Sequence, residues 1–207
     1  MKTLLQVNSS LYSADGQSSR LADQFVSAWR AANPSGKVIV RDLARNPVPH
    51  LTAECFGAFL ARPQDRTPEQ EAVVRESDAL IEELRGADTI VLGLPLYNFA
   101  VPSTLKAYFD HIARAGVTFK YTATGSVGLL TGKKAYVTAA RGGLYAGTAS
   151  DTQTPYVRQF LGFLGIDDVE FVYAEGLAIS EESKAASLAR ATTYIELLTP
   201  AAWREAA

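Results

Sequence analysis

Five apolar segments alternate with helical segments along this chain, and this alternation constrains its fold more than any other feature. The apolar segments are residues 2–7, 37–43, 90–94, 134–139 and 169–174. After the first of them, Leu21, Phe25 and Trp29 recur at four-residue spacing, which places them on one face of a helix. The pattern predicts an α/β fold, with a parallel five-stranded sheet, right-handed crossovers and helices on both faces.

Capping residues indicate where the helices begin and end. Thr67-Pro68-Glu69-Gln70 contains a capping box and a proline in the first turn, and predicts a helix to Arg85 that stops at Gly86. The other predicted helices are 18 or 19 to 32, a stretch of uncertain extent within 46–68, 103 to 112, about 155 to 164, and 180 to 198.

Length and charge narrow the class of protein. A chain of 207 residues favours one domain, and a net charge of −2 gives no general attraction to nucleic acid or to anionic membranes. Cys55 is the single cysteine, so no disulfide can form within the chain, and a reducing compartment, the cytoplasm, is expected. The N-terminus has no secretory signal pattern, and no apolar run approaches the length of a membrane span.

Doubly wound sheets bind ligands beyond the carboxyl ends of their strands, where three loops are expected: 9–19, 95–102 and 140–148. The first loop is rich in hydroxyl groups and leads into a helix N-terminus, which favours a phosphate; an ordinary turn with a helix cap is the alternative. The second joins aromatic and apolar groups to Asn98, as a wall for a flat heteroaromatic ring would; the alternative is core packing of Tyr97 and Phe99. In the third, Gly142 and Gly143 allow a close backbone approach, or form a plain turn beside a solvated Arg141.

Other kinds of site have no support in the sequence. No GxGxxG motif follows the first strand, and residues 128–134 resemble a phosphate-binding loop so weakly that we interpret them as a turn. We expect His50 and His111 to be isolated from Cys55, which argues against a zinc site and against a Cys–His nucleophile pair. We therefore predict neither a metal site nor a catalytic acid, base or nucleophile.

Several motifs in one order resemble the FMN-dependent NADH-azoreductase family over nearly the whole chain. They are residues 96–99 (LYNF), 114–119 (RAGVTF), 131–134 (TGKK), 141–143 (RGG) and 160–165 (FLGFLG). The resemblance implies a single flavodoxin-like FMN-binding domain over residues 1–207, with strand order 2-1-3-4-5, and a homodimer. It also implies non-covalent FMN, NADH or NADPH as electron donor, and small aromatic quinones or azo compounds as acceptors.

The resemblance assigns functional residues one by one. The implied FMN contacts are Ser10, Gly16, Gln17, Ser18, Leu96, Tyr97, Asn98, Phe99, Ala140, Arg141, Gly142 and Gly143. Tyr121 and Phe163 are the implied wall on the substrate side. This sequence departs from the family at Gly16 and Ala140, where members commonly have serine, so two hydroxyl groups are missing.

The implied reaction is a two-electron, ping-pong reduction in which NADH leaves before the acceptor enters. Two rival functions use the same fold: a flavodoxin-type electron carrier without a substrate of its own, and a regulatory subunit without flavin. The small net charge argues against the carrier, because carriers of that type are usually strongly acidic. Residues 116–132 show little regular pattern, and we expect a long loop that is functional or covered by a partner.

Overall fold

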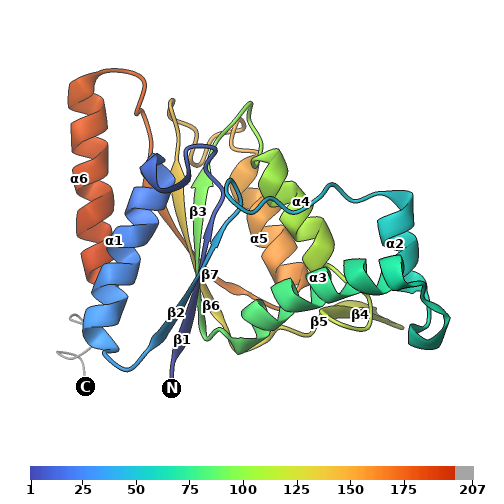
Figure 1. The fold of residues 1–207 in the computed structure, drawn as a ribbon. Helices are drawn as coiled ribbons and strands as arrows, with labels where there is room; N and C mark the ends of the chain where they lie inside the picture. The colour runs from blue at the N-terminus through green and yellow to red at the C-terminus, as the bar shows by residue number, and fades with distance from the viewer. Residues whose placement is uncertain (199–207) are drawn as a thin grey trace.

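The fold is a twisted parallel sheet between two layers of helices (Figure 1), seen in a computed structural model that describes residues 1–198. The sheet strands are β1 (Thr3–Asn8), β2 (Lys37–Asp42), β3 (Thr89–Pro95), β6 (Lys134–Ala140) and β7 (Asp168–Ala174). They pair in parallel in the order β2-β1-β3-β6-β7. The predicted α/β class and five-stranded parallel sheet are confirmed, while residues 199–207 of the predicted domain lie outside the described residues.

The helices cover both faces of the sheet, as predicted. One face carries α1 (Gln17–Ala32) and α6 (Glu181–Leu198), and the other carries α3 (Pro68–Gly86), α4 (Ser103–Ile112) and α5 (Gln153–Phe163) (Figure 1). The remaining helix, α2 (Ala53–Leu60), packs against α3 and stands apart from the sheet. Short 3-10 helices occupy Ser13–Asp15 and Pro63–Asp65. Among residues 1–198, no helix combines the length and apolar character that crossing a membrane requires.

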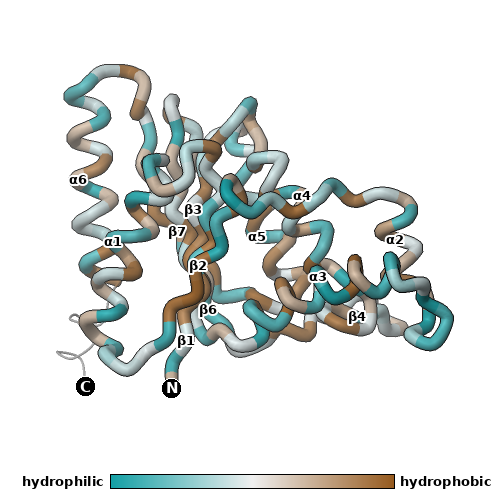
Figure 2. Tube along the Cα trace, in the orientation of Figure 1, coloured by the Kyte–Doolittle hydropathy of each residue, from teal (hydrophilic) through white to brown (hydrophobic). Residues whose placement is uncertain are grey.

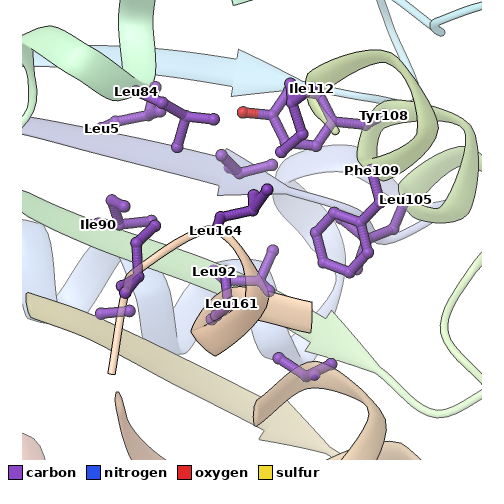
Figure 3. Packing of buried hydrophobic residues seen from close by; sticks show 14 of the residues in the cluster. Leu5, Leu84, Ile90, Leu92, Leu105, Tyr108, Phe109, Ile112, Leu161 and Leu164 are labelled. Carbon is purple, nitrogen blue, oxygen red and sulfur yellow. The ribbon is translucent and has the colours of Figure 1, made fainter. Parts of the chain in front are cut away.

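Each face of the sheet has its own hydrophobic cluster, because the strand residues point alternately to the two layers. Leu92 of β3 packs with Phe109 of α4 and Leu161 of α5 (Figure 3), whereas the neighbouring Val91 faces Phe25 of α1. The central strands are apolar along most of their length, as the brown strands between the helices show (Figure 2). Burial on both faces explains why these strands have continuous apolar sequences.

One segment differs from the expectation. Residues 116–132 contain a two-stranded antiparallel hairpin, β4 (Phe119–Thr122) and β5 (Gly125–Gly128), that does not join the main sheet. The 114–119 motif forms the turn before it: the Thr118 hydroxyl donates to the Ile112 carbonyl and accepts from the Arg114 N–H. Within the segment interpreted as a turn, residues 129–133 connect β5 to β6, and there Lys133 Nζ donates to the carbonyl oxygens of Arg85 and Ala87 at 2.8 and 2.7 Å.

Candidate functional site

The three loops that follow β1, β3 and β6 meet beyond the carboxyl ends of these strands, at the top of the sheet in Figure 1. Here lies a cavity of about 730 Å³, a size typical of small-molecule sites. It is lined by Leu11, Tyr12, Leu96, Tyr97, Asn98, Ala100, Val101, Pro102 and Ser103. The cavity is thus lined by the first and second of the three predicted loops and by no residue of the third.

The N-terminus of α1 presents unused hydrogen-bonding groups at this edge. Ser18 and Ser19 are buried, yet neither hydroxyl has a partner in the structure. Within residues 1–198, the backbone N–H groups of Gln17, Ser18 and Ser19 also make no hydrogen bond. Because the N-terminus of a helix carries a partial positive charge, this arrangement suits an anion such as a phosphate.

Ser10 explains why residue 16 is glycine in this chain. The Ser10 hydroxyl accepts a hydrogen bond from the Tyr12 N–H at 3.2 Å and lies 3.4 Å from the Tyr97 hydroxyl. A Cβ atom on Gly16 would lie 2.1 Å from Ser10 Oγ and 2.5 Å from Ser10 Cβ. The space that a side chain at position 16 would need is therefore filled by the Ser10 side chain.

After β3 the chain makes a tight turn of residues 97–100. Tyr97 and Ala100 exchange two backbone hydrogen bonds, of 3.3 and 3.0 Å, and the two residues between them have positive φ angles, 50° at Asn98 and 62° at Phe99. This conformation costs a non-glycine residue such as Phe99 about 1–2 kcal/mol. The Phe99 side chain is 56% exposed and touches the Tyr145 ring edge to face, so Phe99 is not a core residue.

The loop after β6 is held by Arg141, whose side chain is fully buried. The alternative interpretation, a solvated Arg141 beside a plain turn, is therefore wrong for this side chain. Its guanidinium pairs with Asp151 and Glu175, both at 3.1 Å, and lies over the Tyr173 ring. Burial alone would raise the pKa of Asp151, but hydrogen bonds from Thr154 and Arg141 outweigh it and lower the pKa. The Arg141 side chain is thus committed to the protein interior.

The two glycines that follow have free donors. No hydrogen bond within residues 1–198 engages the N–H of Gly142 or of Gly143, whereas the N–H of Arg141 donates to the Ala174 carbonyl. The carbonyl oxygens of both glycines accept from the 176–178 segment, which fixes the orientation of the loop. The loop can therefore offer two preoriented donors to a ligand.

This chain is similar to known proteins both in sequence and in fold. Residues 1–198 match the model of the family described as having a flavodoxin-like fold. An FMN-dependent NADH:quinone oxidoreductase of Cellvibrio japonicus is 56% identical over 190 residues, which cover 92% of this chain and 96% of the relative. The chain belongs to this flavodoxin-like family.

Solved structures of similar proteins superimpose on nearly the whole chain. An azoreductase from Bacillus anthracis str. Sterne is 30% identical, with a TM-score of 0.84, covering 95% of this chain and 99% of the other. An FMN-dependent NADH-azoreductase from Bacillus anthracis str. Ames Ancestor, solved in complex with FMN, is 28% identical, with a TM-score of 0.86, covering 96% and 100%. The resemblance expected from the sequence motifs is confirmed.

The structure brings the twelve predicted FMN contacts to one edge of the sheet, but it places Tyr121 and Phe163 elsewhere. Both rings contact Phe119, at centroid distances of 5.5 and 4.3 Å. Phe163 is the last residue of α5 and Gln153 the first, so about 15 Å of helix separates Phe163 from the loops. The hairpin that carries Tyr121 lies near the opposite end of the sheet (Figure 1).

The prediction that His111 is isolated from Cys55 is wrong. The Cys55 Sγ lies 3.9 Å from His111 Nε2, because α2 and the end of α4 both pack against α3. Burial raises the pKa of the Cys55 thiol and lowers the pKa of His111, so both groups are held neutral at pH 7. No group of three or more potential metal ligands occurs in the described part of the chain.

Several residues that shape the site were missed by sequence reasoning. Ser19 was within the first loop but was not singled out, although its orphan hydroxyl resembles that of Ser18. Thr152 and Gln153 hold the second loop, and Glu175 accepts hydrogen bonds from the Tyr145 and Ala146 N–H groups at 3.0 and 2.9 Å. Their contacts join segments that are far apart in sequence, so no local sequence pattern indicates them.

Proposed function

We propose that this protein is an FMN-dependent NADH:quinone oxidoreductase that also reduces aromatic azo compounds. The observation that carries the proposal is the pair of buried, unpartnered Ser18 and Ser19 hydroxyls at the α1 N-terminus, at the edge of the sheet that also carries the cavity of about 730 Å³. Relatives named for this reaction, such as the 56% identical enzyme of Cellvibrio japonicus, support the same function.

The residues present suit FMN. Its phosphate would bind the free N–H groups at the start of α1 and the Ser18 hydroxyl, with Ser10 and Gly16 completing the loop and Gln17 at its open side. Its ring system would lie along residues 96–99, and its polar edge would meet Gly142 and Gly143. Bound FMN would supply the redox chemistry, taking hydride from NADH and giving electrons to the acceptor.

The protein's own contribution is binding, orientation and charge stabilisation. The free N–H groups of Gly142 and Gly143 would donate to the polar edge of the ligand, where negative charge would develop, and preoriented donors of this kind need no reorganisation. Ala140 brings no hydroxyl and Arg141 is buried in ion pairs, so backbone groups would make the polar contacts of this loop. No side chain is assigned as acid, base or nucleophile.

We also propose a homodimer in which Tyr121 and Phe163 line the partner's acceptor site. Tyr121 is 76% exposed, and both rings lie at the end of the sheet opposite to the loops of their own chain. They could therefore form a substrate wall only in another copy. Sedimentation at micromolar concentration should give twice the chain mass, and a fully active monomer would refute the shared site.

The remaining proposals concern the context of the site. Residues 1–207 would form one domain, since both hydrophobic clusters pack on the same sheet. The five sheet strands, counted without the hairpin, would correspond to the family order 2-1-3-4-5. A chain with one cysteine suits the reducing cytoplasm.

Two experiments test the proposed reaction. The purified protein should be yellow and release FMN on denaturation. Release of FAD would refute the assignment of FMN, and a colourless protein would favour a regulatory subunit without flavin.

With NADH and a quinone, double-reciprocal plots at several fixed quinone concentrations should be parallel. Intersecting lines would refute the exchange of donor and acceptor at one site. If NADH reduced the flavin only in the presence of another protein, the electron carrier would be the better description.

A further inference from the structure

Three consecutive residues at the start of α5 reach two different loops of the site. Gln153 is 1% exposed, and its Nε2 donates to the carbonyl oxygens of Pro95 at 2.9 Å and Ala100 at 3.2 Å. The hydroxyl of Thr152 donates to the carbonyl oxygen of Phe99. The preceding Asp151 pairs with Arg141, which holds the loop after β6.

Thr152 and Gln153 bind backbone carbonyl groups in and on both sides of the strained turn. Pro95 is the last residue of β3 and Ala100 closes the turn, so one amide group binds the chain before and after Asn98 and Phe99. Thr152 binds Phe99, which has the more positive φ angle of these two residues. Strained conformations persist only where surrounding contacts enforce them, and they gather at functional sites. Without these contacts, the turn at Asn98 and Phe99 would relax toward ordinary backbone angles.

The Asp151 contact extends the arrangement to the third loop. Asp151 accepts from the Thr154 N–H at 3.0 Å and from the Thr154 hydroxyl at 2.7 Å, which fixes it at the first turn of α5. Arg141 reaches the same turn through the Thr154 hydroxyl at 2.9 Å. The helix N-terminus is therefore bonded directly to the loop after β3 and to the loop after β6.

We propose that residues 151–153 are positioning residues that hold the second and third loops in one mutual arrangement, with Gln153 enforcing the strained turn. This inference rests on the proposed function, since the arrangement held is the one offered to FMN. The Gln153 side chain lines a neighbouring cavity of about 520 Å³ and not the cavity of the candidate site, so it acts through the turn. Nothing in the sequence motifs marks these three residues.

The proposal predicts a specific loss on substitution. In Gln153→Leu, the two carbonyl contacts disappear and the turn populates relaxed conformations. Apparent affinity falls with the fraction of molecules in the competent conformation, and strain of the size estimated for Phe99 corresponds to about a tenfold increase in the Kd for FMN. Thr152→Val, which removes one contact with little change of shape, should give a smaller increase.

A rescue separates positioning from general destabilisation. Glycine adopts positive φ angles freely, so Phe99→Gly removes the backbone strain at this position, and the turn no longer needs the Gln153 contacts to hold it. In the Phe99→Gly background, adding Gln153→Leu should raise the Kd for FMN less than about twofold, compared with about tenfold in the natural background. An equal loss in both backgrounds would overturn the proposal, as would an unchanged Kd in Gln153→Leu.

The control variant is Thr192→Val. The Thr192 hydroxyl on α6 donates to Gln24 Oε1 at 3.0 Å, outside the three loops of the candidate site. Its loss should leave the Kd for FMN within about twofold of the natural value. FMN binding is measured by quenching of flavin fluorescence during titration of the apoprotein.

A second measurement does not depend on FMN. Amide hydrogen exchange of residues 96–101 should be faster in Gln153→Leu and in Thr152→Val than in the natural protein, and unchanged in Thr192→Val. If the protein took up no FMN, the proposed function would fail while this measurement still tested the role of Gln153. Unchanged exchange in both variants would overturn the proposal on its own.

Discussion

Substitution of Arg141 by methionine should destabilise the protein through the two acids that it leaves behind. The Asp151 and Glu175 side chains are only 6% and 14% exposed, so Arg141→Met would leave two nearly buried carboxylates without their cation. Breaking a buried ion pair from one side costs about 3–5 kcal/mol. Other donors partly compensate, since Glu175 keeps two backbone N–H groups and Asp151 keeps Thr154. We therefore expect the lower end, a loss of about 3 kcal/mol.

The assay is urea unfolding at pH 7, followed by the fluorescence of the buried Trp29. A loss of about 3 kcal/mol corresponds to a melting temperature lower by about 6–12 °C in a chain of this size. Arg62→Met serves as the control, because Arg62 pairs with Asp65 at 2.6 Å but its side chain is 75% exposed. The control should change the unfolding free energy by less than about 1 kcal/mol. The interpretation would be refuted if the unfolding free energy of Arg141→Met stayed within about 1 kcal/mol of the natural value while FMN binding was lost. Arg141 would then be a direct ligand of FMN.

Three further predictions follow from single sites. Gly16→Ala should weaken FMN binding about tenfold, because its Cβ would force Ser10 aside. Ser10→Gly in the same chain removes both clashing atoms and should restore most of the affinity; an additive loss on titration would contradict this. Tyr108→Phe should be neutral or stabilising by up to about 1 kcal/mol in urea unfolding, since the buried Tyr108 hydroxyl has no partner, and a clear loss would reveal one. The folded-state pKa of Asp151 is lowered, so its contribution to stability is present above the unfolded pKa of about 3.9 and is lost as the pH falls through the folded pKa. Unfolding free energies measured from pH 6 to pH 3 should therefore fall less steeply in Asp151→Asn, and parallel curves would contradict the assignment.

Much of the fold could be predicted because its signals are local. The capping box at Thr67 is present with both of its hydrogen bonds, and each sheet strand lies within a residue or two of its predicted apolar segment. The hairpin was missed because its turn, Ala123-Thr124, lacks the Asn-Gly type of signal and its strands are only four residues long.

The site was predicted less completely because its geometry depends on contacts between distant segments. The positions of the loops follow from the sheet topology, so the first two loops could be predicted to line the cavity. Of the residues that line it, only Leu96, Tyr97 and Asn98 were named as contacts from the sequence. The role of Arg141 could not, because its partner Glu175 lies 34 residues away and the burial of a charge leaves no mark in the sequence. The same holds for Cys55 and His111, which are 56 residues apart and meet only through the packing of helices.

The attachment of α2 has a consequence for local unfolding. This helix buries only Cys55 and Ala58, packs on α3 and not on the sheet, and is joined to the body by the stacking of Arg114 over Phe59 and by the Cys55–His111 contact. A unit with so little buried apolar surface opens at a lower free energy than the central strands. We therefore expect residues 53–60 to exchange their amide hydrogens through a partial opening in which the sheet and its two helical layers stay intact.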